Sequence, residues 1–261
     1  MNLHSTADLE QLQSDLPYLL EITEWSKNFL AKPHADLGRS GPVCPFLPRA
    51  LQLNTIRFAV IRAKNLEQSQ IEEIVRDYRD RFLAMEPNDP ELSLYKAIML
   101  IFPDVQGDDA FKLIDNVQQK LKPFFVESGL MLGEFHQSNE SPGLHNPDFR
   151  PLRSPIPMLA IRFMADADLP FLHRLSDDPH VRIQYVQAYL DRFGGLQDEK
   201  KLNEAYEAIA LAQAQIADST LNGLSNNSSL APTAAKSKCP FARFSALFRP
   251  VQHPVTALVE R

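Results

Sequence analysis

The chain has 261 residues, with 27 Lys and Arg against 33 Asp and Glu, which gives a formal net charge of −6. A chain of this length can bury a substantial core. Its negative charge argues against nucleic acid as a partner, because neutralising phosphates requires a basic face.

The sequence also limits where the protein is expected to work. The N-terminus has neither the basic region nor the apolar region of a secretory signal. No stretch approaches the roughly 18 apolar residues of a transmembrane helix. The two cysteines, Cys44 and Cys239, are expected to be free thiols. We therefore expect a cytoplasmic protein.

Helices and strands alternate in the first part of the chain. Ser69 and Glu72 have the spacing of a capping box, which marks a helix start. From apolar periodicity we predict helices over 16–31, from Ser69 to about Met85, and from Asp108 or Asp109 to near Pro123, with strands over 54–63, 92–103, 129–136 and 156–164.

The rest of the chain is predicted to be helical and then flexible. Asp168-Leu-Pro begins one helical segment, and Asp178-Pro179 begins another that stops at Gly194-Gly195. Residues 198–217 form a last helix. We predict an α+β fold: a single domain over 1–217 with a mixed four-stranded sheet and packed helices, then a flexible linker over 218–238 and a short amphipathic tail over 239–261.

The segment between the last two predicted strands holds the first candidate site. A loop this long is uncommon unless it has a function. Its interspersed apolar residues predict that the loop is ordered and that it folds down to cover a cleft. Glu134 and His136, two apart on a strand, share a face and are the candidate catalytic pair. His136 and His145 are candidate metal ligands, although for His136 a structural role is slightly more common than ligation. Arg150, Arg153 and Arg162 could bind an acidic ligand.

A second candidate site is GRSGPVCPFLPRAL, residues 38–51. Cys44 precedes a proline and could present a thiolate to haem iron, whereas the more common role of such a cysteine is a small buried residue in a turn. Arg39 could bind a carboxylate or phosphate group of a cofactor. The chain has no GxSxG, Walker A, GxGxxG, HExxH or paired CxxC motif, which argues against the standard hydrolase, P-loop, Rossmann and zinc classes.

Three blocks resemble the signature of a bacterial domain family that has no assigned function. They are GRSGPVCPFLPRAL, GLMLGEFH and FRPLRSPIPMLAIRFM, and the resemblance covers about residues 15–195. A weaker likeness is to the YcgG-like haem-dependent N-oxygenases, which also follow an N-terminal helix with a Pro/Cys/Phe segment and a strand like TIRFAVI. This second resemblance implies haem as the cofactor.

Three hypotheses for function follow. The first is a small-molecule biosynthetic enzyme, a haem-dependent oxygenase in which Cys44, His136 or His145 ligates iron and the arginines hold propionates or an acidic substrate. It predicts that Cys44, His136 and at least two of the three arginines line one pocket. The second is a non-catalytic accessory module whose CPF-bearing tail, 239–261, docks on a protein partner. The third is a cofactor-free enzyme that binds an acidic substrate through arginines.

Overall fold

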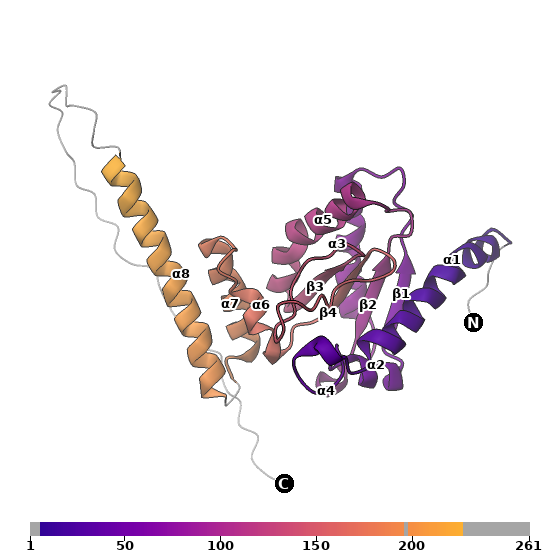
Figure 1. The fold of residues 1–261 in the computed structure, drawn as a ribbon, viewed down its shortest axis with the longest axis horizontal. Helices are drawn as coiled ribbons and strands as arrows, with labels where there is room; N and C mark the ends of the chain where they lie inside the picture. Colours follow the sequence, from indigo (N-terminus) through magenta and orange to yellow (C-terminus); the bar gives the residue numbers. More distant parts are fainter. Residues whose placement is uncertain (1–5, 196–197, 227–261) are drawn as a thin grey trace, which may run out of the picture. The chain divides into compact units, whose positions relative to one another are not determined.

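A computed structural model of the protein describes residues 6–195 and 198–226. The chain divides into two units, Met1–Ser219 and Thr220–Arg261. The first unit holds the sheet and the helices that pack on it (Figure 1). The predicted tail over 239–261, with Cys239, and residues 227–238 of the predicted linker lie outside the described residues.

The sheet has four strands in the order β1-β2-β4-β3. Its strands are β1 (Ile56–Val60), β2 (Ala97–Ile101), β3 (Leu130–Phe135) and β4 (Met158–Phe163). β1 and β2 are parallel, and β4 runs antiparallel between β2 and β3. The predicted α+β class, the mixed four-stranded sheet and the pairing of the last two strands are therefore confirmed.

In chain order, the helices are α1 (Thr6–Trp25), the π-helix η1 (Ser26–Leu30), the 3₁₀ turn η2 (Ala35–Leu37), α2 (Leu47–Leu53), α3 (Gln68–Ala84), α4 (Pro90–Ser93), α5 (Asp108–Glu127), η3 (Asp166–Asp168), α6 (Leu169–Leu172), α7 (Pro179–Phe193) and α8 (Glu199–Asn226). As predicted, Asp178 caps α7, where its carboxylate accepts the His180 backbone N–H at 2.8 Å.

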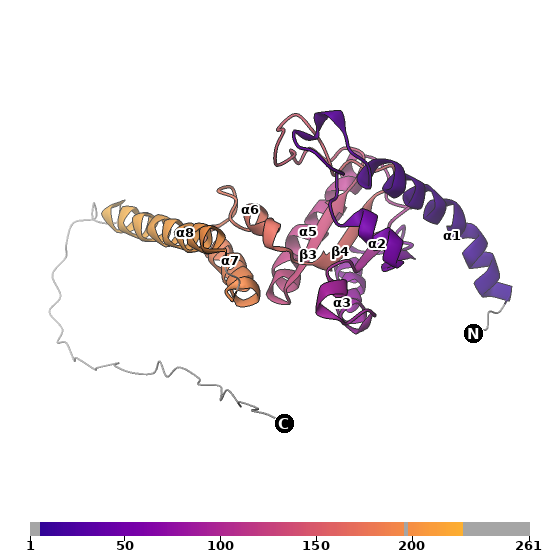
Figure 2. The same ribbon diagram turned by 90° about the horizontal axis from the view of Figure 1, so that it is seen from below.

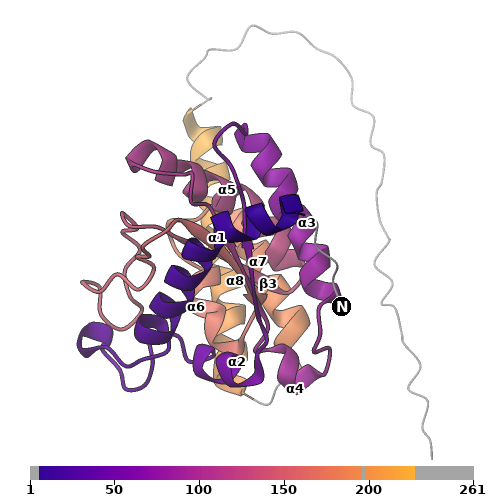
Figure 3. The same cartoon turned by 90° about the vertical axis from the view of Figure 1, so that its right-hand side faces the viewer.

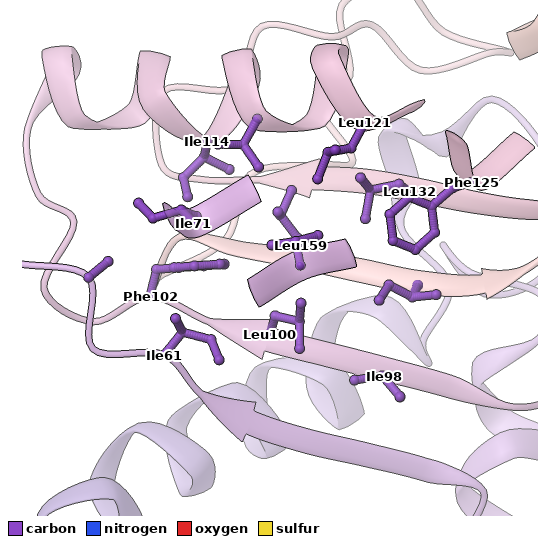
Figure 4. Close-up of a cluster of buried hydrophobic side chains, with 14 of the residues drawn as sticks. Ile61, Ile71, Ile98, Leu100, Phe102, Ile114, Leu121, Phe125, Leu132 and Leu159 are labelled. Atoms are coloured by element: carbon purple, nitrogen blue, oxygen red, sulfur yellow. The ribbon is translucent and has the colours of Figure 1, made fainter. Parts of the chain in front are cut away.

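The two faces of the sheet bury different apolar cores because successive strand residues point in opposite directions. Ile98 and Leu100 of β2 join a core with residues of α3 and α5, in which Leu100, Leu132 and Leu159 lie beneath α5 (Figure 4). Met99 and Ile101 of the same strand join a second core with residues of α1 and α2. Figure 2 shows α1 and α2 on one side of the sheet and α3 and α5 on the other.

Several boundaries differ from the predictions. The first helix begins at Thr6 instead of residue 16 and gives way to a π-helix at Ser26, and β1 is shorter than the predicted 54–63. The cap of α3 is Glu67, whose backbone N–H donates to the side-chain oxygen of the third helical residue, Gln70, at 2.9 Å, so the helix begins before Ser69. Residues 90–93 form α4 and shorten the second strand. α5 continues through Pro123 to Glu127, because the exposed Gln119 carbonyl that loses its partner can bond to water. α8 continues beyond 217 to Asn226, so the linker does not begin at 218.

The long loop, residues 136–157, packs against the segment 34–38 (Figure 3). Phe149 of the loop is buried, and its ring lies 4.8 Å from that of His34. Asn146 donates to the Asp36 backbone carbonyl at 2.8 Å. Gly38 has a φ of +77°, and a Cβ there would lie 2.7 Å from the His145 carbonyl oxygen. Glycine is therefore required where the two segments meet.

Candidate functional site

Cys44 and Arg162 lie on the side of the sheet that faces α1 and α2. Cys44 is half-buried beside the core on that side, and its backbone N–H donates to the Leu30 carbonyl. Arg162 of β4 forms a two-pronged ion pair with Asp168 at 2.6 and 2.7 Å. Burial lowers the pKa of Arg162, but the hydrogen bonds and charge of Asp168, with a smaller effect of Cys44, outweigh it and raise the pKa.

His136 lies on the opposite side, against α5. Its ring stacks on Phe111 with centroids 5.1 Å apart, and its Nε2 lies 2.9 Å from Asp115 Oδ1. The imidazole side chain is 4 % exposed. Its Nδ1 atom is buried and has no hydrogen-bond partner among the described residues.

The other predicted site residues lie neither beside Cys44 and Arg162 nor beside His136. Arg150 and Arg153 both pair with Glu140 inside the long loop. His145 is exposed on the same loop. Arg39 donates to the backbone carbonyls of Ser40 and Val43 in its own turn. Each of the three predicted ligand-binding arginines therefore has a carboxylate partner already, from Glu140 or Asp168.

The prediction of one shared pocket is therefore wrong. Cys44 and His136 are separated by the sheet, and alternation along β3 puts His136 on the α5 side. The three alternative iron ligands lie apart and the arginines are paired with carboxylates, so the described residues do not form the single haem pocket that the first hypothesis predicts. In the described part of the chain, no group of three or more His, Cys, Asp or Glu side chains is arranged to hold a metal ion.

The structure does bring together the predicted catalytic pair, with additional charged residues from α5 and the segment before α7. Glu134 and His136 both point toward α5. Asp115 of α5 contacts His136, and Lys122 lies two turns further along the same helix. Glu134 interacts electrostatically with Asp115, Lys122 and Arg174. We call Asp115, Lys122, Glu134, His136 and Arg174 the α5–β3 polar cluster.

The charges in this cluster are perturbed in opposite directions. Burial is the largest cause that raises the pKa of Glu134, and the negative charge of Asp115 adds to it, while its own backbone N–H, Arg174 and Lys122 oppose the rise. Burial lowers the pKa of Lys122, and the negative charges of Asp177 and Glu134 only partly offset this. A carboxyl group whose pKa is raised and an ammonium group whose pKa is lowered therefore interact electrostatically in this cluster.

Hydrogen bonds and ring contacts hold Lys122 in place. Its Nζ donates to the Phe171 carbonyl at 3.3 Å, lies 3.7 Å from Asp177 Oδ2 and sits 4.7 Å from the centre of the Tyr185 ring. Burial, and then the charge of Asp177, raises the pKa of Tyr185 to about 12, so its hydroxyl stays protonated. Lys122 is 15 % exposed and Asp115 48 %, which gives the cluster one solvent-accessible side.

Sequence reasoning identified Glu134 and His136 but missed the residues from other elements. Asp115 and Lys122 are seven residues apart on α5 and so share a helix face, beside the apolar stripe of Ile114 and Leu121. That spacing was visible in the sequence. That this face lies over β3 was not, because it depends on β3 forming the edge of the sheet.

Neither of two open surface hollows coincides with the cluster. One, of about 460 Å³, is lined by Gln68 of α3 and by Asn116, Gln119, Lys120 and Pro123 of α5. The other, of about 500 Å³, is lined by residues 199–207 of α8. Among the described residues, no helix is both long and apolar enough to cross a membrane.

Comparison with known proteins places the chain in a family. No curated protein and no solved structure gave a match. A family model described as a domain of unknown function (DUF6875) matches residues 19–205, which include α2, the whole sheet and the α5–β3 polar cluster. The chain therefore belongs to this family, as the resemblance to a family without an assigned function predicted.

Proposed function

We propose that the protein is a small-molecule enzyme that performs general acid–base chemistry on an acidic substrate at the α5–β3 polar cluster. The observation that carries the proposal is the raised pKa of Glu134 next to Lys122, whose pKa is lowered. Opposed pKa shifts in neighbouring groups are typical of acid–base sites.

Each residue has a distinct role in this proposal. Glu134 keeps its proton at a higher pH than an ordinary carboxyl group and acts as the proton donor or acceptor. Lys122 and Arg174 supply positive charge for a carboxylate or phosphate of the substrate. Asp115 fixes the orientation of His136 through Nε2, while the buried Nδ1 has no partner among the described residues.

The proposal keeps the predicted acidic substrate and the predicted catalytic pair but uses no haem. Cys44, His145, Arg39, Arg150 and Arg153 have no part in it, because they lie on the other face of the sheet or in their own loops.

Proton exchange in D₂O tests this function without knowledge of the product. The protein is incubated with a panel of 2-oxo acids, 2-hydroxy acids and amino acids, and loss of C–H signals is followed by proton NMR. We expect exchange in at least one class, and a decrease of about 10²-fold or more in Glu134→Gln. Exposed Glu127→Gln is the matched control. Exchange that is equal in Glu134→Gln and the wild type would contradict the proposal.

A second candidate function, a module that binds a protein partner, is favoured by the surface of α1. Leu12, Leu16 and Leu20 are each 46–55 % exposed and recur every four residues on this helix. The acidic residues Glu10, Glu21 and Glu24 are also exposed on α1. An apolar stripe beside negative charges suits a basic amphipathic helix.

A binding experiment separates this candidate from the enzyme. A basic amphipathic peptide with leucines at every fourth position is titrated against the full chain, with an acidic peptide of the same leucine pattern as control. Leu16→Lys should abolish binding of the basic peptide without changing proton exchange. If the wild type bound both peptides equally, or if Leu16→Lys bound the basic peptide as well as the wild type does, a charge-complementary docking surface would be ruled out.

A further inference from the structure

Arg182 is a buried arginine whose charge no described carboxylate neutralises. It lies in the first turns of α7 and is 2 % exposed. One of its terminal nitrogens donates to the side-chain carbonyl of Gln215 on α8. Its Nε atom is buried and has no hydrogen-bond acceptor among residues 6–195 and 198–226.

The surroundings of Arg182 are apolar and lack a countercharge. Tyr185 and Val186, on the same face of α7, are buried in the core that α7 shares with α8, and Ala212 of α8 is buried one turn before Gln215. Within the described ranges, no Asp or Glu carboxylate lies within 4 Å of the guanidinium. An amide oxygen accepts a hydrogen bond but carries no net charge, so the cost of burying the cation is not offset.

Other described arginines with a role in packing do have compensating contacts. Arg162 pairs with Asp168, and Arg62 pairs with both Asp15 and Asp104. Arg192 donates from Nε to the Met164 carbonyl, and its guanidinium lies 4.7 Å from the centre of the Phe163 ring. Arg182 differs from all three because, in the part of the chain that the structure describes, its charge has no carboxylate partner and its Nε–H has no acceptor.

We propose that Arg182 and Gln215 form a binding site for an oxyanion between α7 and α8. The ligand is a phosphate or carboxylate group, because guanidinium donors match the spacing of two oxygens on either. One ligand oxygen accepts the free Nε–H of Arg182, and the Gln215 amide lies beside it to donate a second hydrogen bond. The N-terminus of α7 is already capped by Asp178, so the site depends on these two side chains.

This site is separate from the α5–β3 polar cluster, because it uses α7 and α8 and none of the cluster's residues. The failure of either proposal therefore leaves the other intact. A ligand at Arg182 would also link α7 to α8 and stabilise their packing, since binding to the folded state alone raises stability.

Thermal unfolding of the full chain tests the site. Inorganic phosphate and acetate are titrated separately at constant ionic strength, with chloride as the balancing anion. We expect a saturable rise in Tm, on the order of 5 °C, with one or both anions. Phosphate alone would assign a phosphate site and acetate alone a carboxylate site. Arg182→Met should abolish the rise, whereas exposed Arg49→Met should keep it. No saturable rise in the wild type, or an equal rise in Arg182→Met, would overturn the proposal.

A second measurement covers the case in which Arg182→Met does not fold. Arg182→Lys keeps the charge but loses the Nε–H and the planar fork, so it should weaken the anion response at least tenfold. In the wild type, the ¹H–¹⁵N signal of Arg182 Nε should shift on titration with the same anion. An Nε signal that does not move at saturating phosphate or acetate would exclude direct binding.

Discussion

At the scale of single residues, the α5–β3 polar cluster combines a buried carboxyl group, a buried ammonium and an oriented imidazole. Burial acts on Glu134 and Lys122 in the same physical way, by disfavouring the charged form of each. Their attraction limits the two shifts but does not cancel them. The folded protein therefore carries groups that destabilise it at neutral pH, which is common where residues are selected for chemistry instead of stability.

Glu134→Gln should reveal that cost as a dependence of stability on pH. Because its pKa is higher in the folded state than in the unfolded state, Glu134 stabilises the fold below the unfolded pKa, and this contribution is lost as pH rises through the folded pKa. We expect the free energy of unfolding of the variant, relative to the wild type, to increase between pH 4 and pH 7. Urea unfolding at several pH values measures it. A relative stability that falls over this range would show that the pKa of Glu134 is lowered.

His136→Ala should destabilise the protein by about 2–4 kcal/mol, because it removes a buried ring that packs on Phe111. Asp115→Asn changes only the hydrogen-bond partner of His136, and the Asp115 side chain is half exposed. This substitution should lower the free energy of unfolding by about 1 kcal/mol. Urea denaturation compares the two variants. Equal and small effects would mean that the His136 ring is not packed as described.

At the scale of elements, the long loop is fixed by its contact with residues 34–38. Phe149 and Asn146 make that contact from the loop, and Gly38 provides the close approach on the other side. Fixing a loop costs roughly 1–2 kcal/mol per residue in backbone entropy, so buried contacts of this kind are needed to keep it ordered. The structure thus gives the physical reason for a loop that the sequence predicted to be ordered.

Gly38→Ala should loosen this contact. The substitution forces an unfavourable positive φ and brings a Cβ against the His145 carbonyl, at a cost of about 1–3 kcal/mol. We expect faster proteolysis between residues 137 and 155. Gly41→Ala is the matched control, since Gly41 also has a positive φ but its Cβ would meet only Arg39 Nη1, at 3.5 Å. Identical proteolysis of the two variants would show that the contact at Gly38 does not hold the loop.

Local patterns predicted most elements, and the errors have identifiable causes. Asp178-Pro179 marked the start of α7 correctly because a cap acts within one turn. Ser69 was a plausible cap, but Glu67 caps the helix instead, because the Glu67–Gln70 pair satisfies backbone groups earlier in the chain. Proline at 123 did not end α5, because packing of Phe125 and Val126 continues the helix past it. Spacing along the chain cannot report such tertiary packing.

At the scale of the whole molecule, the sheet decides which residues can form a site. β4, the last strand in the chain, inserts between β2 and β3, and the long loop returns the chain to make this possible. His136 and Cys44 come from opposite faces, so the pocket expected from their sequence blocks does not form. The expectation of a family without an assigned function is confirmed, yet which residues of the three blocks meet depends on long-range strand order.

The core between the sheet, α3 and α5 should dominate stability. Leu100 of β2 is fully buried there, and Leu100→Ala should lower the free energy of unfolding by about 2–5 kcal/mol. Leu144→Ala, in the exposed part of the long loop, should change it by less than about 0.5 kcal/mol. Chemical denaturation measures both. A similar effect of the two substitutions would contradict the described burial.

The most direct test of the acid–base site is the titration of Glu134 itself. The side-chain carboxyl carbon is followed by ¹³C NMR across the acidic and neutral range, with Glu134→Gln used to assign the signal. We predict a pKa above the ordinary value of a glutamate, and a further rise in Lys122→Met, because Lys122 stabilises the charged form of Glu134. A pKa at or below the ordinary value, unchanged in Lys122→Met, would contradict the account of this site.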